Sequence, residues 1–279
     1  MSDRHRLAER AAPALLLLAL AVAAIVPAPG GLRLGSADTD ATERWGAALD
    51  GLPADATVLV GFDPDLGTYP EIRPTVRATI ADLLAREARL AFVSLTPEGR
   101  ALLLTELARL DRLDVNLARL LDLGFVPGAE AALVSLAGGV AAPEGTGSIA
   151  RELAAEGPGA FEALLVVGGN DIGPRSWVEQ YVPRVEPLPV LAIAPTVLLP
   201  EIQPYVASGQ LEAVLGTPRD GATYRGTVEL GSLDRLRDAR EPSAAGLLLG
   251  IVAAIVVLGH AWFVRVARSA GVGGREERQ

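Results

Sequence analysis

The sequence of 279 residues contains no cysteine, and all 25 of its basic residues are arginine, so lysine is absent as well. Without cysteine there is no thiol nucleophile and no zinc site of the cysteine type. Without lysine there is no amine nucleophile, no Schiff-base residue and no phosphate-binding lysine of the P-loop kind. These absences exclude several common catalytic chemistries whatever the fold.

Histidine is almost absent too, since His5 and His260 are the two that the chain contains and both lie outside residues 31–243. That middle region therefore holds no Ser-His-Asp triad. It holds 30 of the 34 acidic residues and 18 of the 25 basic ones. An excess of negative charge repels phosphate backbones and anionic lipid headgroups, so we expect no nucleic acid partner.

Two apolar segments, residues 11–28 and 244–264, flank the middle region. The second has 21 residues and as a helix spans about 31 Å, which matches the hydrocarbon core of a bilayer. The first is shorter and suits a signal peptide or a signal anchor. Because Pro29 follows the small-residue site at its end, we expect an uncleaved transmembrane anchor.

The charges around these segments predict a topology. Arginines lie on the outer side of both segments, within residues 1–10 and 265–279. The positive-inside rule therefore predicts a two-pass protein of the cell membrane with both termini cytoplasmic and residues 29–243 extracytoplasmic. Gly246 and Gly250 form a G-x-x-x-G step, a spacing that permits self-association or pairing with the first segment.

Strand-like and helix-like stretches alternate through the middle region. Short apolar runs predict strands, and amphipathic or capped stretches between them predict helices. The predicted strands are 57–62, 90–95, 124–128, 163–169 and 189–195. The predicted helices are 40–52, 73–88, 96–110, 115–123, 129–136, 148–156 and 174–182. This order predicts an α/β fold, a doubly wound and mainly parallel sheet of about five strands with helices on both faces.

Aspartates follow two of the predicted strands, and ligands of such folds bind at the carboxyl ends of strands. Asp63 and Asp65 follow the first strand and Asp171 follows the fourth. Three carboxylates at one edge could hold Mg²⁺ or Ca²⁺, although no cofactor is otherwise expected. The alternative is that Asp63 caps the turn that leaves the strand while Asp65 is solvated.

The stretch PYVASGQL (204–211) carries Tyr205, Ser208 and Gln210 within an otherwise apolar sequence that resembles a helix, a turn and a second helix. Uncharged polar groups of this kind can make oriented hydrogen bonds to a protein partner. They can equally cap the second helix. Both interpretations stay open at this point.

Two functions fit these observations. The first is a membrane-anchored extracytoplasmic module for binding or assembly, with a protein partner or self-association, as a subunit of an envelope complex. It rests on the two apolar segments and on the missing catalytic residue types. The alternative is a carboxylate-based, divalent-metal-assisted hydrolase of the cell envelope, built from the three aspartates. The first predicts that the protein is not an enzyme.

Overall fold

The computed structural model describes residues 40–113, 117–139, 153, 156–169 and 172–227. All of them belong to one unit of the chain, residues 36–238. The apolar segments 11–28 and 244–264, with Gly246 and Gly250, lie outside the described residues. Within the described ranges no helix has both the length and the apolar character needed to cross a bilayer.

The centre of the fold is a six-stranded sheet in which every neighbouring pair is parallel and the strand order is β3-β2-β1-β4-β5-β6. The strands are β1 (Thr57–Asp63), β2 (Arg89–Ser94), β3 (Leu120–Phe125), β4 (Ala163–Gly168), β5 (Val190–Ile193) and β6 (Ala213–Leu215). The predicted parallel α/β sheet is thereby confirmed, with one strand more than expected.

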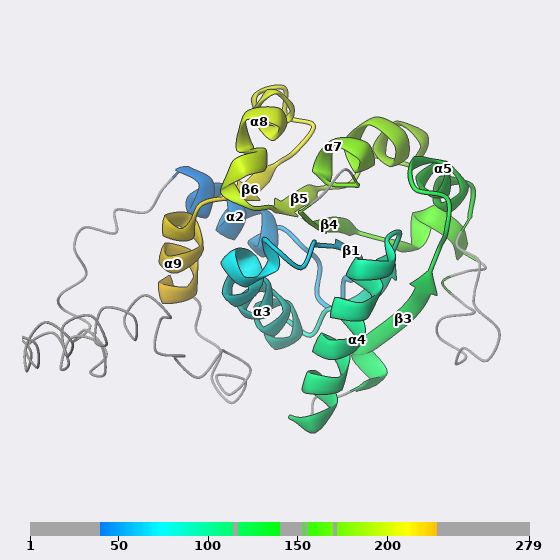
Figure 1. Cartoon of the computed structure of the whole chain (residues 1–279), viewed down its shortest axis with the longest axis horizontal. Helices are drawn as coiled ribbons and strands as arrows, with labels where there is room; N and C mark the ends of the chain where they lie inside the picture. Colours follow the sequence, from blue (N-terminus) through cyan, green and yellow to red (C-terminus); the bar gives the residue numbers. More distant parts are fainter. Residues whose placement is uncertain (1–39, 114–116, 140–152, 154–155, 170–171, 228–279) are drawn as a thin grey trace, which may run out of the picture. The chain divides into compact units, whose positions relative to one another are not determined.

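Helices cover both faces of the sheet (Figure 1). One face carries α2 (Asp40–Asp50), α3 (Tyr69–Ala85), α4 (Pro97–Arg112) and α9 (Pro218–Thr227). The other carries α5 (Glu130–Gly138), η2 (Gly157–Ala160), α7 (Pro174–Ser176), the π-helical turn η3 (Trp177–Tyr181) and α8 (Leu199–Ala207). Short 3₁₀ turns complete the connections: η1 (Leu117–Arg119), η4 (Val182–Arg184) and η5 (Thr196–Leu198).

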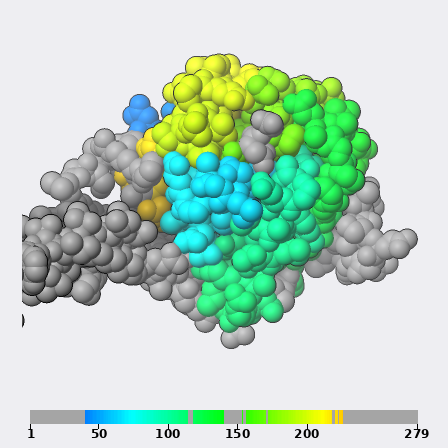
Figure 2. Space-filling view, in the orientation of Figure 1, coloured from blue at the N-terminus to red at the C-terminus, as the bar shows by residue number. Residues whose placement is uncertain are grey.

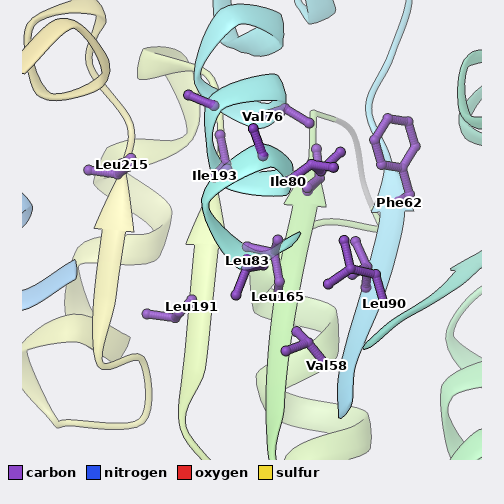
Figure 3. Packing of buried hydrophobic residues seen from close by; sticks show 14 of the residues in the cluster. Val58, Phe62, Val76, Ile80, Leu83, Leu90, Leu165, Leu191, Ile193 and Leu215 are labelled. Carbon is purple, nitrogen blue, oxygen red and sulfur yellow. The ribbon is translucent and has the colours of Figure 1, made fainter. Parts of the chain in front are cut away.

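The hydrophobic core forms because the central strands carry apolar side chains on both faces of the sheet. All residues of β1 and all residues of β4 are buried, as expected for central strands of a sheet covered on both faces. Val58 and Phe62 face the α3 side while Leu59 faces the α5 side, because alternate side chains point to opposite faces. In Figure 3, α3 lies across the sheet and packs Ile80 against the strand side chains.

Three predicted elements were wrong in detail. Residues 115–123 were expected to be a helix, but β3 begins at Leu120 and pairs with β2. The predicted strand 124–128 is therefore shifted: β3 ends at Phe125. Helix α3 begins at Tyr69, four residues before the predicted start, so that Pro74 lies inside the helix rather than in its first turn.

The stretch after α8 was also predicted wrongly. No helix begins directly after Gly209; instead the chain enters β6, which pairs with β5 at the edge of the sheet, and the next helix is α9. Gly209 has φ +76, a backbone conformation that ends α8 and that glycine adopts without steric cost. The chain therefore turns back to the sheet where the sequence suggested a helical pair.

Helices α2 and α9, the first and last of the described elements, lie together at the left of Figure 1. The rings of Trp45 and Tyr224 meet edge to face with their centroids 6.0 Å apart. The Tyr224 hydroxyl donates a hydrogen bond of 2.8 Å to Asp82 of α3. The beginning and the end of the described chain are thus joined to the same helix, α3.

Candidate functional site

The sheet reverses its winding between β1 and β4. The helices after β1 and β2 cover one face, whereas those after β3, β4 and β5 cover the other. In open α/β sheets ligands bind outside the carboxyl ends of the strands at such a switch point. Here that place lies between Asp63, the last residue of β1, and Gly168, the last residue of β4, which are register partners.

The Asp63 carboxylate is buried, with 1% of the residue exposed, and it is held at the N-terminus of α4. Its Oδ1 accepts hydrogen bonds from the backbone N–H groups of Leu95 and Thr96, both at 2.8 Å, and from Thr96 Oγ1 at 3.0 Å. Thr96 also caps α4, because its hydroxyl oxygen accepts a hydrogen bond from Gly99 N at 3.0 Å. One carboxylate therefore fastens the end of β1 to the start of α4.

The second oxygen of Asp63, Oδ2, is buried and has no hydrogen-bond partner among the described residues. Burial raises the pKa of Asp63 from 3.8 to about 6, even though the hydrogen bonds from Leu95 and Thr96 act to lower it. This carboxyl consequently titrates closer to neutrality than an ordinary aspartate.

The turn before Thr68, the N-cap residue of α3, is held by Asp65. Its Oδ1 accepts hydrogen bonds from Gly67 N at 2.8 Å and Thr68 N at 2.9 Å, and its Oδ2 accepts one from the Thr68 hydroxyl. Partial burial acts to raise its pKa, but the hydrogen bonds from Thr68 and Gly67 leave that pKa below its ordinary value. Asp65 is therefore ionised at neutral pH and supplies the negative charge that a helix N-terminus attracts.

A third carboxylate links α3 to the turn after β5. Glu71 Oε1 accepts hydrogen bonds from Thr196 N at 3.0 Å and Thr196 Oγ1 at 2.7 Å. The same hydroxyl lies 2.9 Å from the carbonyl oxygen of Gly216, at the end of β6. This connection ties three segments together at the carboxyl edge of the sheet.

The switch point is closely packed where β4 ends. A Cβ on Gly169 would lie 2.7 Å from Asp65 Oδ2, 2.7 Å from Thr68 Oγ1 and 3.0 Å from Asp65 N. Glycine is required there because the turn after β1 lies directly against the backbone. In dinucleotide-binding folds with this strand order, the N-terminus of the first crossover helix receives phosphate. Here the carboxylate of Asp65 accepts the donors that a phosphate would use.

The whole carboxyl edge is acidic for a reason that follows from the topology. All strands are parallel, so every crossover helix begins at this edge, and acidic residues are favoured in the first helical turn. The acidic residues in these first turns are Glu71, Glu98, Glu130, Glu201 and Asp220. Two arginines of this edge are paired with carboxylates: Arg100 with Asp122, and Arg175 with Glu201.

Of the three predicted metal ligands, Asp63 and Asp65 lie at the switch point and Asp171 lies outside the described residues. Within the described ranges no group of three His, Asp or Glu side chains is arranged to hold a metal ion. Asp63 binds N–H donors at the start of α4, not in the turn that leaves β1 as the capping alternative predicted, and it is Asp65 that binds the N–H donors of that turn. The three-carboxylate metal site stays a prediction.

The predicted partner-binding residues lie at the end of α8. Ser208 is the C-cap, and its hydroxyl lies 3.1 Å from the carbonyl oxygen of Tyr205 and 3.0 Å from Gln210 Oε1. The Tyr205 hydroxyl donates to Glu179 of η3. Since β6 follows, the proposed cap of a second helix was wrong, and these side chains make local contacts. Their role in binding a partner is untested.

Sequence analysis did not identify the partner of Glu71 or the close approach of the backbone at Gly169. Glu71 belongs to a helix whose start was predicted too late, and its partner Thr196 is 125 residues away. Gly169 was included in a predicted strand. A glycine directly after a buried strand is the one local signal of the close approach that the structure contains.

Comparison with known proteins adds little. No model of a known protein family matches the chain, and no curated protein does. One solved structure, described as "Structure of MT0777", is similar at 16% sequence identity with a TM-score of 0.35, covering 67% of this chain and 98% of that chain. Neither value is high enough to transfer a function.

Proposed function

We propose that this chain is a membrane-anchored protein whose α/β domain binds a partner protein outside the cytoplasm, as a subunit of an envelope complex. The observation that carries the proposal is the use of the switch-point donors by the chain's own carboxylates. Asp63 occupies the start of α4 and Asp65 the start of α3. The place where this fold class ordinarily binds a phosphorylated cofactor thus offers acceptors instead of donors.

The residue types support the same proposal. The middle region lacks cysteine, lysine and histidine, so thiol, amine and imidazole catalysis are not available to it. Carboxylates and hydroxyls are present, but those at the switch point hold backbone N–H groups and helix termini. A structural use of these side chains leaves recognition by the outer surface as the best-supported activity.

The anchoring part of the proposal rests on the apolar segments 11–28 and 244–264 and on the arginines beyond them. The side-by-side arrangement of α2 and α9 supports it, because the two linkers toward these segments start from neighbouring helices.

Topology is tested by adding protease to intact spheroplasts and to inverted vesicles that carry the full chain. We expect digestion of the α/β domain in spheroplasts and protection in inverted vesicles. A periplasmic and a cytoplasmic marker protein serve as controls for sealing. Digestion in inverted vesicles alone would show that the domain faces the cytoplasm and would refute the proposed location.

Partner binding is tested by crosslinking the full chain in intact membranes and purifying it under denaturing conditions. We expect a defined adduct that contains one other polypeptide at constant stoichiometry, and the same complex after mild detergent extraction without a crosslinker. A chain that is recovered alone by both methods would refute the proposed role as a subunit.

A metal-assisted hydrolase is the second candidate, and the buried, unpartnered Oδ2 of Asp63 is the observation that favours it. A divalent cation would give this oxygen a partner, with Asp65 and Asp171 as further ligands. Calorimetric titration of the purified full chain with Mg²⁺, Ca²⁺ and Mn²⁺ tests it. Binding that is lost in both Asp63→Asn and Asp171→Asn would support the hydrolase, whereas the absence of binding would exclude this site.

A further inference from the structure

Two apolar side chains project from turns at the carboxyl edge of the sheet, after β1 and after β5. Leu66, in the turn after β1, is 61% exposed, and Val197, in η5 after β5, is 72% exposed. They are the most exposed large hydrophobic residues in the described part of the chain. The remaining three, Leu104, Phe125 and Val134, are 41–48% exposed and lie on α4, β3 and α5.

The turns that carry Leu66 and Val197 are fixed. Asp65 holds the turn around Leu66 through its hydrogen bonds to Gly67 and Thr68. Thr196, directly before Val197, is held by Glu71. Glu71, which binds Thr196, belongs to α3, the helix that begins directly after the turn of Leu66. In Figure 2 the cyan segment that follows β1 adjoins the yellow segment around α8 on the face shown.

Apolar side chains on a fixed backbone are suited to binding, because little conformational entropy remains to be lost when a partner covers them. Isolated exposed leucines are ordinary features of a protein surface. A pair on two turns that hydrogen bonds hold in place, at the edge where this fold class binds its ligands, is a stronger indication of a contact surface.

The charges at the same edge indicate what kind of partner it binds. Asp65 lies beside Leu66 in the sequence, and the exposed Glu71 and Glu98 lie in the first turns of helices that begin at this edge. Such a rim repels nucleic acid and anionic lipid headgroups, and it attracts basic side chains. A protein segment with an apolar residue between arginines or lysines complements both features.

We propose that Leu66 and Val197 form the docking surface for a basic, apolar-centred segment of the partner protein. This inference deepens the proposed function and depends on it. The partner's apolar side chains pack on Leu66 and Val197, and its basic side chains meet the carboxylates of the rim. The surface does not include Tyr205, Ser208 and Gln210, whose polar groups contact one another or Glu179.

The test places a photoreactive benzoylphenylalanine at four positions of the full chain, one at a time, in intact cells. Leu66 and Val197 are the test positions, and Leu104 and Val134 are matched exposed controls. We expect adducts with the same polypeptide at both test positions and at neither control. Sequencing of the crosslinked peptide is expected to show a net positive segment, and the adduct yield in isolated membranes is expected to fall as salt is raised.

A second measurement uses substitutions at the same positions. We expect the double variant Leu66→Ser/Val197→Ser to lower the amount of co-purified partner at least tenfold, while Leu104→Ser/Val134→Ser leaves it unchanged. Unchanged tryptophan fluorescence of both variants, from buried Trp45 and Trp177, checks that the domain is folded.

Several outcomes would overturn the inference. Adducts of the test positions with a second copy of this chain, with lipid, or with an acidic segment would each show that the occupant is a different one. Partner adducts at the control positions alone would refute this surface but leave the proposed function standing. No adduct at any position, together with a chain that purifies alone, would refute both.

Discussion

Substitution of Asp63 gives the sharpest test of the site, because its buried carboxyl has a pKa of about 6 against an ordinary value of 3.8. At 1.36 kcal/mol for each pH unit, that difference corresponds to about 3 kcal/mol of folding free energy. Below about pH 4 the group is protonated in the folded and unfolded chain alike, and this contribution to stability is fully present. Between about pH 4 and pH 6 the unfolded chain ionises first, so the free energy of unfolding falls.

Asp63→Asn removes this titration while its amide oxygen can still accept the hydrogen bonds of Leu95 and Thr96. We therefore expect the variant to gain stability relative to the natural chain as the pH rises from about 4 to about 6, by up to about 3 kcal/mol. Other groups titrate in the same range, but they are common to both proteins and cancel in the difference.

The measurement is urea unfolding of the full chain in detergent at several pH values, followed by tryptophan fluorescence. Asp63→Ala serves as the contrasting variant, because it leaves the N–H groups of Leu95 and Thr96 without an acceptor; we expect a loss of about 2–4 kcal/mol. Parallel stability curves of the natural chain and Asp63→Asn between pH 4 and pH 6.5 would refute the raised pKa. A loss of stability of Asp63→Asn relative to the natural chain as the pH rises would show that the pKa of Asp63 is lowered and not raised by burial.

Three further predictions concern the same edge and its support. Asp65→Ala should cost about 1 kcal/mol in the free energy of unfolding at pH 7, as for loss of an N-cap, and the difference should shrink on acidification because the pKa of Asp65 is lowered. Gly169→Ala should destabilise by about 1–3 kcal/mol because its Cβ would meet Asp65 Oδ2 at 2.7 Å, whereas Gly46→Ala, with no atom within 4 Å, should stabilise α2 by about 0.5–1 kcal/mol. Tyr224→Phe should cost about 1–3 kcal/mol through the lost hydrogen bond to Asp82, measurable as faster hydrogen exchange in α9.

The central strands could be predicted from sequence because their information is local. β1, β4 and β5 are short apolar runs with β-branched residues, and both of their faces are covered. β3 was not predicted because its leucines are spaced as on one face of a helix. Buried and partly exposed residues alternate along LLDLGF, and only the pairing with β2 shows that this segment is a strand. β6 has three residues, too few for any periodicity to be read.

The site was predictable in part. Asp63 and Asp65 stand directly after a recognisable strand, and this placed them correctly at the carboxyl edge. Their roles depend on partners that the sequence does not identify: the N–H groups that bind Asp63 come from residues 32 and 33 positions away. Whether a carboxylate is a free ligand or a helix cap is decided by such non-local contacts.

The negative charge of the carboxyl edge could nevertheless have been predicted, because each helix that begins there contributes acidic residues from its own first turn. A helix favours acidic residues in its first turn, and a parallel sheet gathers the first turns of its crossover helices at one edge. Many doubly wound proteins leave one of these helix N-termini open, and phosphate binds there. In this chain Asp65 and Asp63 bind the N–H groups of Thr68 and Thr96, the N-cap residues of α3 and α4. An edge of that kind favours cationic groups over anionic ones, so a basic polypeptide is a better candidate for its ligand than a nucleotide.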